Sequence, residues 1–352
     1  MIARTAYECL STKICPWLEE PLAHLEEARQ EERFAHGWML AGPPGIGKIN
    51  LALVAAERLL NPQSAAPTAL EPQEAASAMA QRHEPGEHHP DLHWIFPADG
   101  KRTLSVDQVR EMADTLALTS LEGAGKVVVL EPADAMTISA ANALLKTLEE
   151  PTERTYLLLV THQPGQLPAT VRSRCQSLPI PVPGKNIALD WLANSNTEVN
   201  ERDWIQLLAL SEGAPFRAMA FQESDYINKN KILDTVFHGI YERKVDPQSV
   251  ADDWLKEKDD LVLALSWLAA RLRWAIRARV APQASNPIKD LNSDSSHNAW
   301  QELTPRTLFQ RLQHTEMVLN QLGKGINTDL AIRALFLGFQ GEKGLSRVNR
   351  KA

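Results

Sequence analysis

The chain has 352 residues, 44% hydrophobic and 23% charged, which is enough for two or three domains of an ordinary globular protein. Its net charge of −7 argues against broad electrostatic wrapping of nucleic acid by this chain alone. Three cysteines do not make a disulfide framework, and the sequence has no membrane-spanning apolar stretch and no signal-peptide pattern, so we expect a cytoplasmic protein that does not contact a membrane.

Residues 38–60 read as a strand, a glycine-rich loop and a helix. Trp38-Met39-Leu40 is typical of a strand, and a helical pattern covers 51–60. Between them lies a phosphate-loop candidate with Gly42, Gly45, Gly47 and Lys48. In such a loop the glycines let backbone N–H groups converge on phosphate at a helix N-terminus, and the lysine reaches the phosphates.

The position after Lys48 is Ile49, where the motif needs a Ser or Thr hydroxyl to bind Mg²⁺. Two interpretations stay open for the loop. One is weak nucleotide or anion binding, and the other is a loop kept only for its turn geometry.

Residues 61–88 are rich in Pro, Ala, Gln and Glu with little periodicity, which predicts an insertion or long loop. His83, His88, His89 and His93 lie in or just after it, but four histidines without thiolates do not resemble a structural zinc site, so we expect no zinc. Farther on, Leu92–Phe96 predicts a strand. Ser105 with Gln108 forms a capping-box pattern for a helix that starts at Val106.

The stretch from Val127 to Ser177 predicts a strand–helix–strand unit. Two short apolar runs, Val127–Leu130 and Tyr156–Val160, are typical of buried parallel strands. Between them one helical face repeats apolar residues at i, i+3, i+4 and i+7, and Pro151 ends the helix. A loop carrying Arg172 and Arg174 follows the second strand.

The run Asn142–Pro151, the strand after it and Ser173-Arg174-Cys175 together resemble the AAA+ module of clamp-loader subunits. The resemblance implies an α/β P-loop domain with a parallel sheet flanked by helices, over residues 1–181. It also implies a small helical lid over 182–223 and an all-α collar domain over 224–345 that forms a ring with its partners. We expect the basic tail, 346–352, to be disordered.

The same resemblance assigns roles to single residues. Glu131 stands at the Walker B aspartate position, but Pro132 replaces the catalytic glutamate, so we expect no hydrolysis of ATP by this chain. The side chain of Asp134 is expected to leave the turn in another direction. Thr161 occupies the sensor-1 position. Arg174 resembles an arginine finger, and Cys175 is expected to pack as a small apolar residue rather than act as a nucleophile.

In the lid, Phe216 takes the place of the sensor-2 arginine, and Arg217 lies one position later, pointing about a third of a turn away. The pattern resembles the bacterial DNA polymerase III clamp-loader subunits that lack catalytic acids yet keep Ser-Arg-Cys. It implies gamma/tau and delta subunits as partners, and sliding clamp and primed DNA reached through the complex. No certain cofactor or metal is expected, and ATP binding stays open.

Two rival interpretations remain. One is an active ATPase subunit of the gamma type, against which Ile49 and Pro132 both count. The other is a DNA-binding module that uses the arginine-rich segment Leu261–Val280, against which the acidic net charge counts.

Overall fold

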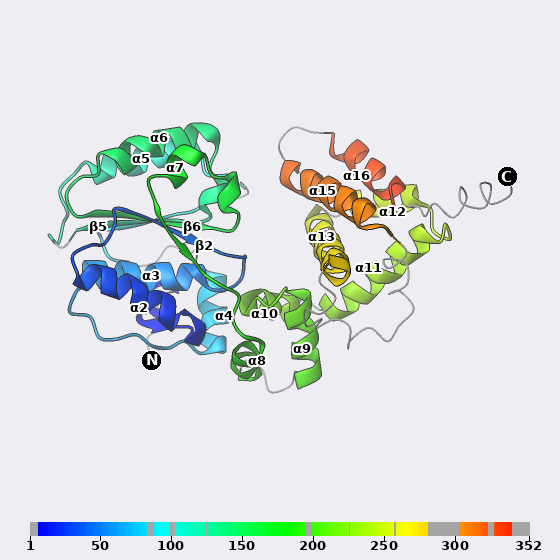
Figure 1. The fold of residues 1–352 in the computed structure, drawn as a ribbon, viewed down its shortest axis with the longest axis horizontal. Helices are drawn as coiled ribbons and strands as arrows, with labels where there is room; N and C mark the ends of the chain where they lie inside the picture. Colours follow the sequence, from blue (N-terminus) through cyan, green and yellow to red (C-terminus); the bar gives the residue numbers. More distant parts are fainter. Residues whose placement is uncertain are drawn as a thin grey trace. The chain divides into compact units, whose positions relative to one another are not determined.

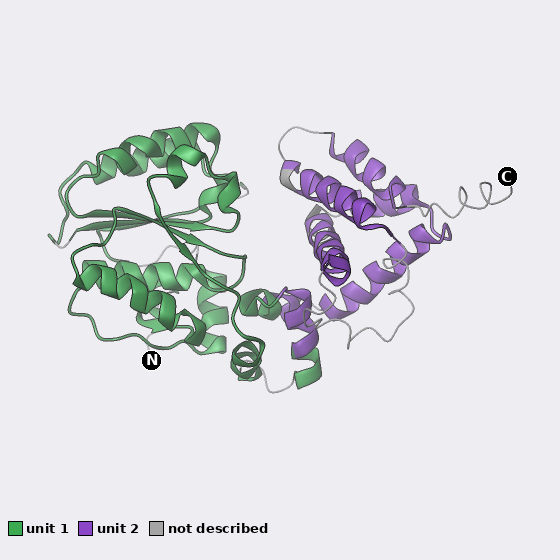
Figure 2. Cartoon of the chain, viewed as in Figure 1, with its two compact units in different colours: residues 1–204, 213–219 green, residues 205–212, 220–352 purple. Residues whose placement is uncertain are grey.

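The structure is a computed structural model that describes residues 6–82, 88–98, 101, 103–123, 125–194, 199–224, 226–256, 258–280, 303–322 and 327–339. The chain divides into two compact units (Figure 2). The first is 1–204 with 213–219, and the second is 205–212 with 220–352. The basic tail at 346–352 lies outside the described residues, and the expected lid and collar boundaries stay predictions.

Unit 1 is built on a five-stranded parallel sheet with the strand order β4-β5-β6-β2-β7. The strands are β2 (Gly37–Ala41), β4 (Leu92–Ile95), β5 (Lys126–Leu130), β6 (Thr155–Thr161) and β7 (Gln176–Pro179). The four strands predicted from apolar runs are confirmed to within a residue at each end. The fifth, β7, was not foreseen because it is an edge strand whose Gln176 and Ser177 are exposed.

Helices cover both faces of this sheet (Figure 1). On one face lie α2 (Glu19–Gln30) and α3 (Lys48–Leu60), and on the other α5 (Val106–Leu116), α6 (Ile138–Glu149) and α7 (Ala169–Arg172). The predicted capping box is present, since Ser105 Oγ accepts from the backbone N–H of Gln108 at 3.3 Å. The α/β class with helices on both faces of a parallel sheet is therefore confirmed.

Within 61–88 the structure describes 61–82 and 88, and these residues correct the expectation of a long loop. They contain β3 (Thr68–Ala69), which pairs in parallel with β1 (Lys13–Ile14), and α4 (Pro72–Gln81), which packs against α1 (Ala6–Thr12). Proline occupies the first turn of α4, and Glu74 accepts a hydrogen bond from the backbone N–H of Glu71 at 3.4 Å. The buried face of α4 consists of alanines and Pro72, so the usual apolar periodicity is weak.

The remaining elements are helical. Three single-turn helices span Pro16–Leu18, Ala133–Ala135 and Pro164–Gln166. The C-terminal half holds α8 (Lys185–Ala193), α9 (Glu201–Leu210), α10 (Pro215–Glu223), α11 (Tyr226–Tyr241), α12 (Pro247–Lys256), α13 (Lys258–Val280), α15 (Pro305–Gln321) and α16 (Thr328–Leu337). Among the described helices, none combines the length and hydrophobicity needed to cross a bilayer.

Unit 2 has an aromatic core. Phe237 of α11 contacts the rings of Trp254, Trp267, Phe336 and Phe339 at centroid distances of 5.4–5.7 Å. Helix α13 packs along α15, and α12 packs along α16. These helices therefore bury aromatic surface around α11, and this burial stabilises the unit.

Candidate functional site

The carboxyl ends of three neighbouring strands bring the predicted nucleotide-site residues together. Strand β6 lies between β2 and β5, so Thr161 at its end separates the P-loop from Glu131. Ala41 pairs with Thr161, and the backbone N–H of Gly42 donates to the Thr161 carbonyl at 3.2 Å. This edge is where parallel α/β sheets bind their ligands, as the resemblance implies.

The P-loop has the expected backbone, but its lysine is folded onto the loop itself. Gly45 and Gly47 have φ of +79° and +87°, which L side chains rarely adopt. Lys48 is 3% exposed, and its Nζ donates to the carbonyls of Gly42 at 2.7 Å and Pro43 at 2.6 Å. Burial lowers the pKa of Lys48 to about 8. The ammonium group is thus satisfied by protein carbonyls rather than held open for phosphate.

The turn at the start of α10 closes over the same loop within unit 1. The backbone N–H of Phe216 donates to the Gly45 carbonyl at 3.1 Å, and a Cβ on Gly45 would lie 2.8 Å from the Cβ of Arg217. The Phe216 ring packs near Gly47 and contacts the rings of Trp17 and Trp191. Phe216, which stands at the expected sensor-2 position, therefore places an aromatic ring against the loop instead of an arginine.

The residues present do not fit a Mg²⁺–nucleotide complex. Ile49 is 3% exposed and contributes to the core instead of supplying a hydroxyl. At the Walker B position, Glu131 Oε1 lies 3.5 Å from Nη1 of Arg82, which follows α4. Burial raises the pKa of Glu131, and the charge of Arg82 opposes that rise. Glu131, the acid that would face a metal ion, is therefore already paired with the guanidinium group of Arg82.

Asp134 corrects the expectation that its side chain leaves the site. Its Oδ1 accepts from the Thr161 hydroxyl at 2.9 Å and from the backbone N–H of His162 at 2.8 Å. Its charge also opposes the fall in the Lys48 pKa. Burial, together with the charge of Lys48, lowers the pKa of His162 to about 4. The Thr161 hydroxyl therefore holds a carboxylate of the same chain.

The arginine loop lies apart from these groups, after α7. Ser173 and Arg174 are exposed, while Cys175 is half-buried and packs against the core between the sheet and α6. Burial raises the pKa of the Cys175 thiol to about 11, so the thiol stays protonated at neutral pH, in keeping with the expected packing role. Arg172, two residues before Arg174, is exposed as well.

The Arg174 side chain is held from two sides. Its Nη2 lies 2.5 Å from Glu149 Oε1, at the end of α6. Its Nη1 donates to the carbonyl of Thr170 at 2.9 Å. The Arg174 side chain is 36% exposed, so it stays accessible from outside the chain.

Sequence reasoning missed Arg82, His162 and Glu149 as neighbours of the motif residues. No sequence signal marks Arg82, because its partner is distant in the chain. Glu149 did carry a signal, since an acid in the last turn of a helix is electrostatically unfavourable and suggests a nearby cation.

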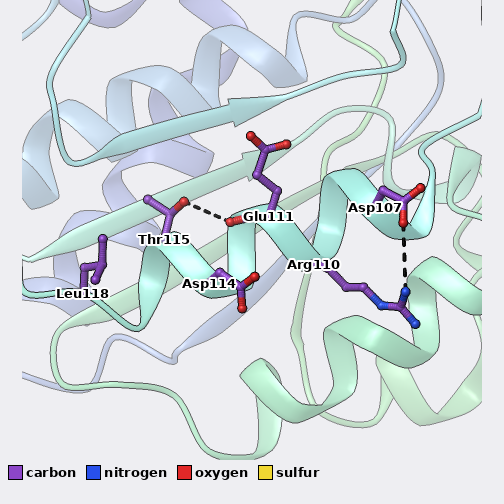
Figure 3. Close-up of a pocket in the computed structure, with 6 residues that line it drawn as sticks. All are labelled: Asp107, Arg110, Glu111, Asp114, Thr115 and Leu118. Carbon is purple, nitrogen blue, oxygen red and sulfur yellow. Dashed lines mark hydrogen bonds and ion pairs between the residues drawn. The ribbon is translucent and has the colours of Figure 1, made fainter.

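A separate hollow lies on the exposed side of α5. Figure 3 shows its lining of Asp107, Arg110, Glu111, Asp114, Thr115 and Leu118. Asp107 faces Arg110 at 3.9 Å, and the Thr115 hydroxyl bonds only the carbonyl of Glu111 in its own helix. This hollow is a solvated helix face. Among the residues that the structure describes, no group of three or more His, Cys, Asp and Glu could hold a metal ion.

Comparisons with known proteins point to one family. The family model described as "DNA polymerase III, delta subunit" matches residues 17–183. A Pseudomonas aeruginosa protein named DNA polymerase III subunit delta' is 40% identical over 241 residues, covering 68% of this chain and 71% of that protein. The Escherichia coli protein of the same name is 30% identical over 336 residues, covering 92% of this chain and 94% of its own. The Haemophilus influenzae protein of this name is 28% identical over 324 residues, covering 91% of this chain and 95% of that protein.

Proposed function

The chain belongs to the DNA polymerase III subunit delta' family, and on that premise we propose that it is a clamp-loader subunit that hydrolyses no ATP itself and supplies Arg174 to a neighbour's ATP site. We propose that the neighbour is a gamma/tau subunit and that delta completes the ring. The assembly would act in the cytoplasm, where it loads the sliding clamp onto primed DNA during replication.

The contrast between the two motif regions carries this proposal. The exposed Arg174 loop is complete, whereas the chain's own nucleotide site has Ile49 at the Mg²⁺-ligand position and Pro132 at the catalytic-acid position. Arg82 beside Glu131 adds a positive charge where a metal ion would bind. A chain of this kind can act on ATP only when the ATP is bound elsewhere.

The geometry supports a transition-state role for Arg174. A guanidinium group is permanently charged, and its planar array of N–H donors matches phosphate oxygens in pairs. Negative charge spreads over the transferred phosphoryl oxygens in the transition state, so a cation placed there lowers the barrier. The exposure of Arg174 at the end of a short loop suits a group that reaches out of its own subunit.

The test is a complex reconstituted with gamma and delta, assayed for ATPase stimulated by clamp and primed DNA. Arg174→Ala should leave assembly intact and reduce hydrolysis at the site it completes by about 10³-fold, the lower end of the contribution that an arginine finger makes in GTPases. Arg172→Ala, at the exposed arginine that ends α7 just before this loop, is the matched control and should keep wild-type turnover. Equal turnover of Arg174→Ala and wild type would leave only a scaffolding role.

The arginines of α13 give little support to the DNA-binding alternative. Arg271 is 5% exposed and lies 3.3 Å from Asp234. Arg273 pairs with Glu212 and Glu316, and Arg277 also pairs with Glu212. Because acids of the same unit already engage these three side chains, a phosphate backbone would have to displace them.

A further inference from the structure

Glu149 lies beside the arginine finger candidate and is placed to control it. We propose that Glu149 is a positioning residue that fixes the direction of the Arg174 guanidinium, an inference that rests on the proposed role of Arg174. The ion pair between Nη2 and Oε1 spans 2.5 Å, and both side chains are partly exposed. Glu149 ends α6 and Arg174 follows α7, so the two elements bring the side chains together.

The backbone beneath the two residues is tightly packed. Leu148, next to Glu149, is buried in the core between the sheet and α6, and Cys175, next to Arg174, packs against that core. Both neighbours meet at Gly37 in β2. A Cβ there would lie 3.0 Å from Leu148 Cδ2 and 3.2 Å from both the Arg174 carbonyl and Cys175 Sγ. The end of α6 and the arginine loop are therefore packed against the same residue of β2, which fixes the two backbones beside each other.

The location of Glu149 is unfavourable for α6 alone. It is the last residue of the helix, Ile138–Glu149, where the unpaired carbonyl groups give the helix end a partial negative charge. A carboxylate there is repelled unless a cation is near, and Arg174 is that cation. The acid is therefore explained by its contact with the arginine loop and not by helix formation.

The contacts leave part of the guanidinium group available. Arginine has five N–H donors, of which the ion pair uses Nη2 and the Thr170 carbonyl uses Nη1. These contacts, with a third from Nη1 to Ser173 Oγ at 3.4 Å, orient the guanidinium plane, and the N–H groups that they leave over can meet a phosphate. A flexible arginine would have to lose rotamer freedom on reaching the transition state, whereas a held one has lost it beforehand.

The experiment uses the full chain in the complex with gamma and delta, with kcat and KM for ATP measured under clamp and primed-DNA stimulation. Glu149→Ala should lower kcat about 2- to 5-fold, the range of an exposed ion pair, with KM unchanged. Glu149→Asp should restore most of the rate, and Glu149→Gln should not. Glu150→Ala, at the adjacent exposed acid, is the control and should match wild type.

A double-mutant cycle with Arg174→Ala separates positioning from structure. The effect of Glu149→Ala should vanish when Arg174 is already alanine. The same loss in both backgrounds would show a structural role, and an unchanged or higher kcat for Glu149→Ala alone would also reject positioning. Wild-type turnover of Arg174→Ala would overturn the proposed function, and this inference with it. A large loss for Arg174→Ala without any for Glu149→Ala would overturn only the inference.

Discussion

At the scale of single residues, the side chains of the candidate nucleotide site bind other groups of the same chain. Lys48 binds loop carbonyls, Glu131 faces Arg82, and the Thr161 hydroxyl binds Asp134. The identities of Ile49 and Pro132 could be read from the sequence, since a missing hydroxyl and a missing carboxylate are visible in a motif. The internal partners could not, because Glu131–Arg82 and Thr161–Asp134 join residues far apart in the chain, and the motif does not show that Lys48 binds its own loop.

His162 should make the stability of unit 1 depend on pH. Its pKa is about 4 in the folded chain, below the ordinary value of 6.5. Between these values the unfolded chain binds a proton that the folded chain does not, so stability is present above pH 6.5 and is lost as the pH falls toward 4. Between pH 7 and pH 5, we expect the free energy of unfolding of unit 1 to fall by about 2 kcal/mol more in wild type than in His162→Gln.

Hydrogen exchange of the β6 amides would measure this difference, because it reports the opening of unit 1 separately from unit 2. The control is His24→Gln, at an exposed histidine of the same unit, which should keep the wild-type pH dependence. Identical pH slopes for wild type and His162→Gln would contradict the assignment of this loss to His162.

At the scale of elements, the apolar strands were predictable and the polar or alanine-rich elements were not. Strand β5 buries every one of its five residues, so its composition alone indicates its place in the sheet. Strand β7 exposes three of four residues, and α4 buries only proline and alanines. Their formation depends on pairing with β2 and packing on α1, which are tertiary contacts that a local pattern does not contain.

Helix α4 has a consequence for attempts to restore nucleotide binding. Ile49→Thr replaces the missing Mg²⁺ ligand, but Arg82 would still face Glu131 at 3.5 Å. We expect the isolated Ile49→Thr chain to show no Mg²⁺-dependent binding of a fluorescent ATP analogue. Ile49→Thr combined with Arg82→Ala should bind it more tightly than either single variant, because a metal ion no longer competes with a guanidinium group.

Titration of wild type, the two single variants and the double variant with the analogue, with and without Mg²⁺, would check this prediction. The control is Ile49→Thr combined with Lys101→Ala, which removes a positive charge elsewhere in unit 1. This double variant should bind the analogue no more tightly than Ile49→Thr alone. Mg²⁺-dependent binding by Ile49→Thr alone, equal to that of the double variant, would show that Arg82 does not oppose the metal ion.

At the scale of the whole molecule, two units with separate cores divide the proposed work. Unit 1 holds the P-loop and Arg174, and unit 2 is helical throughout its described part, as the resemblance implied for a collar. Helix content and the arginine-rich segment of unit 2 could be predicted from the sequence. The pairing of Arg271 with Asp234 could not, because α11 and α13 carry many charges and spacing does not select partners.

Unit 2 should be sensitive to loss of that pair. Asp234→Ala leaves the buried Arg271 guanidinium without its acid, and such a loss costs about 3–5 kcal/mol. Asp253→Ala removes an exposed pair with Lys256 and should cost less than about 1 kcal/mol. Calorimetry should show a lower transition temperature for unit 2 with the unit 1 transition retained. Equal transitions for the two variants would mean that the Arg271 contact contributes no stability.

The internal cations of the P-loop site also bear on how this subunit can change over evolution. If the chain hydrolyses no ATP, as we propose, hydrolysis would require at least a hydroxyl at Ile49, an acid at Pro132 and removal of Arg82 from Glu131. Any one of these changes alone brings no activity that selection could favour, and replacing Arg82 first would leave a buried acid without its cation. Under the proposed function, the absence of hydrolysis is in this sense entrenched, so descendants of this chain are free to refine the Arg174 loop but have no single-step route to an active ATPase.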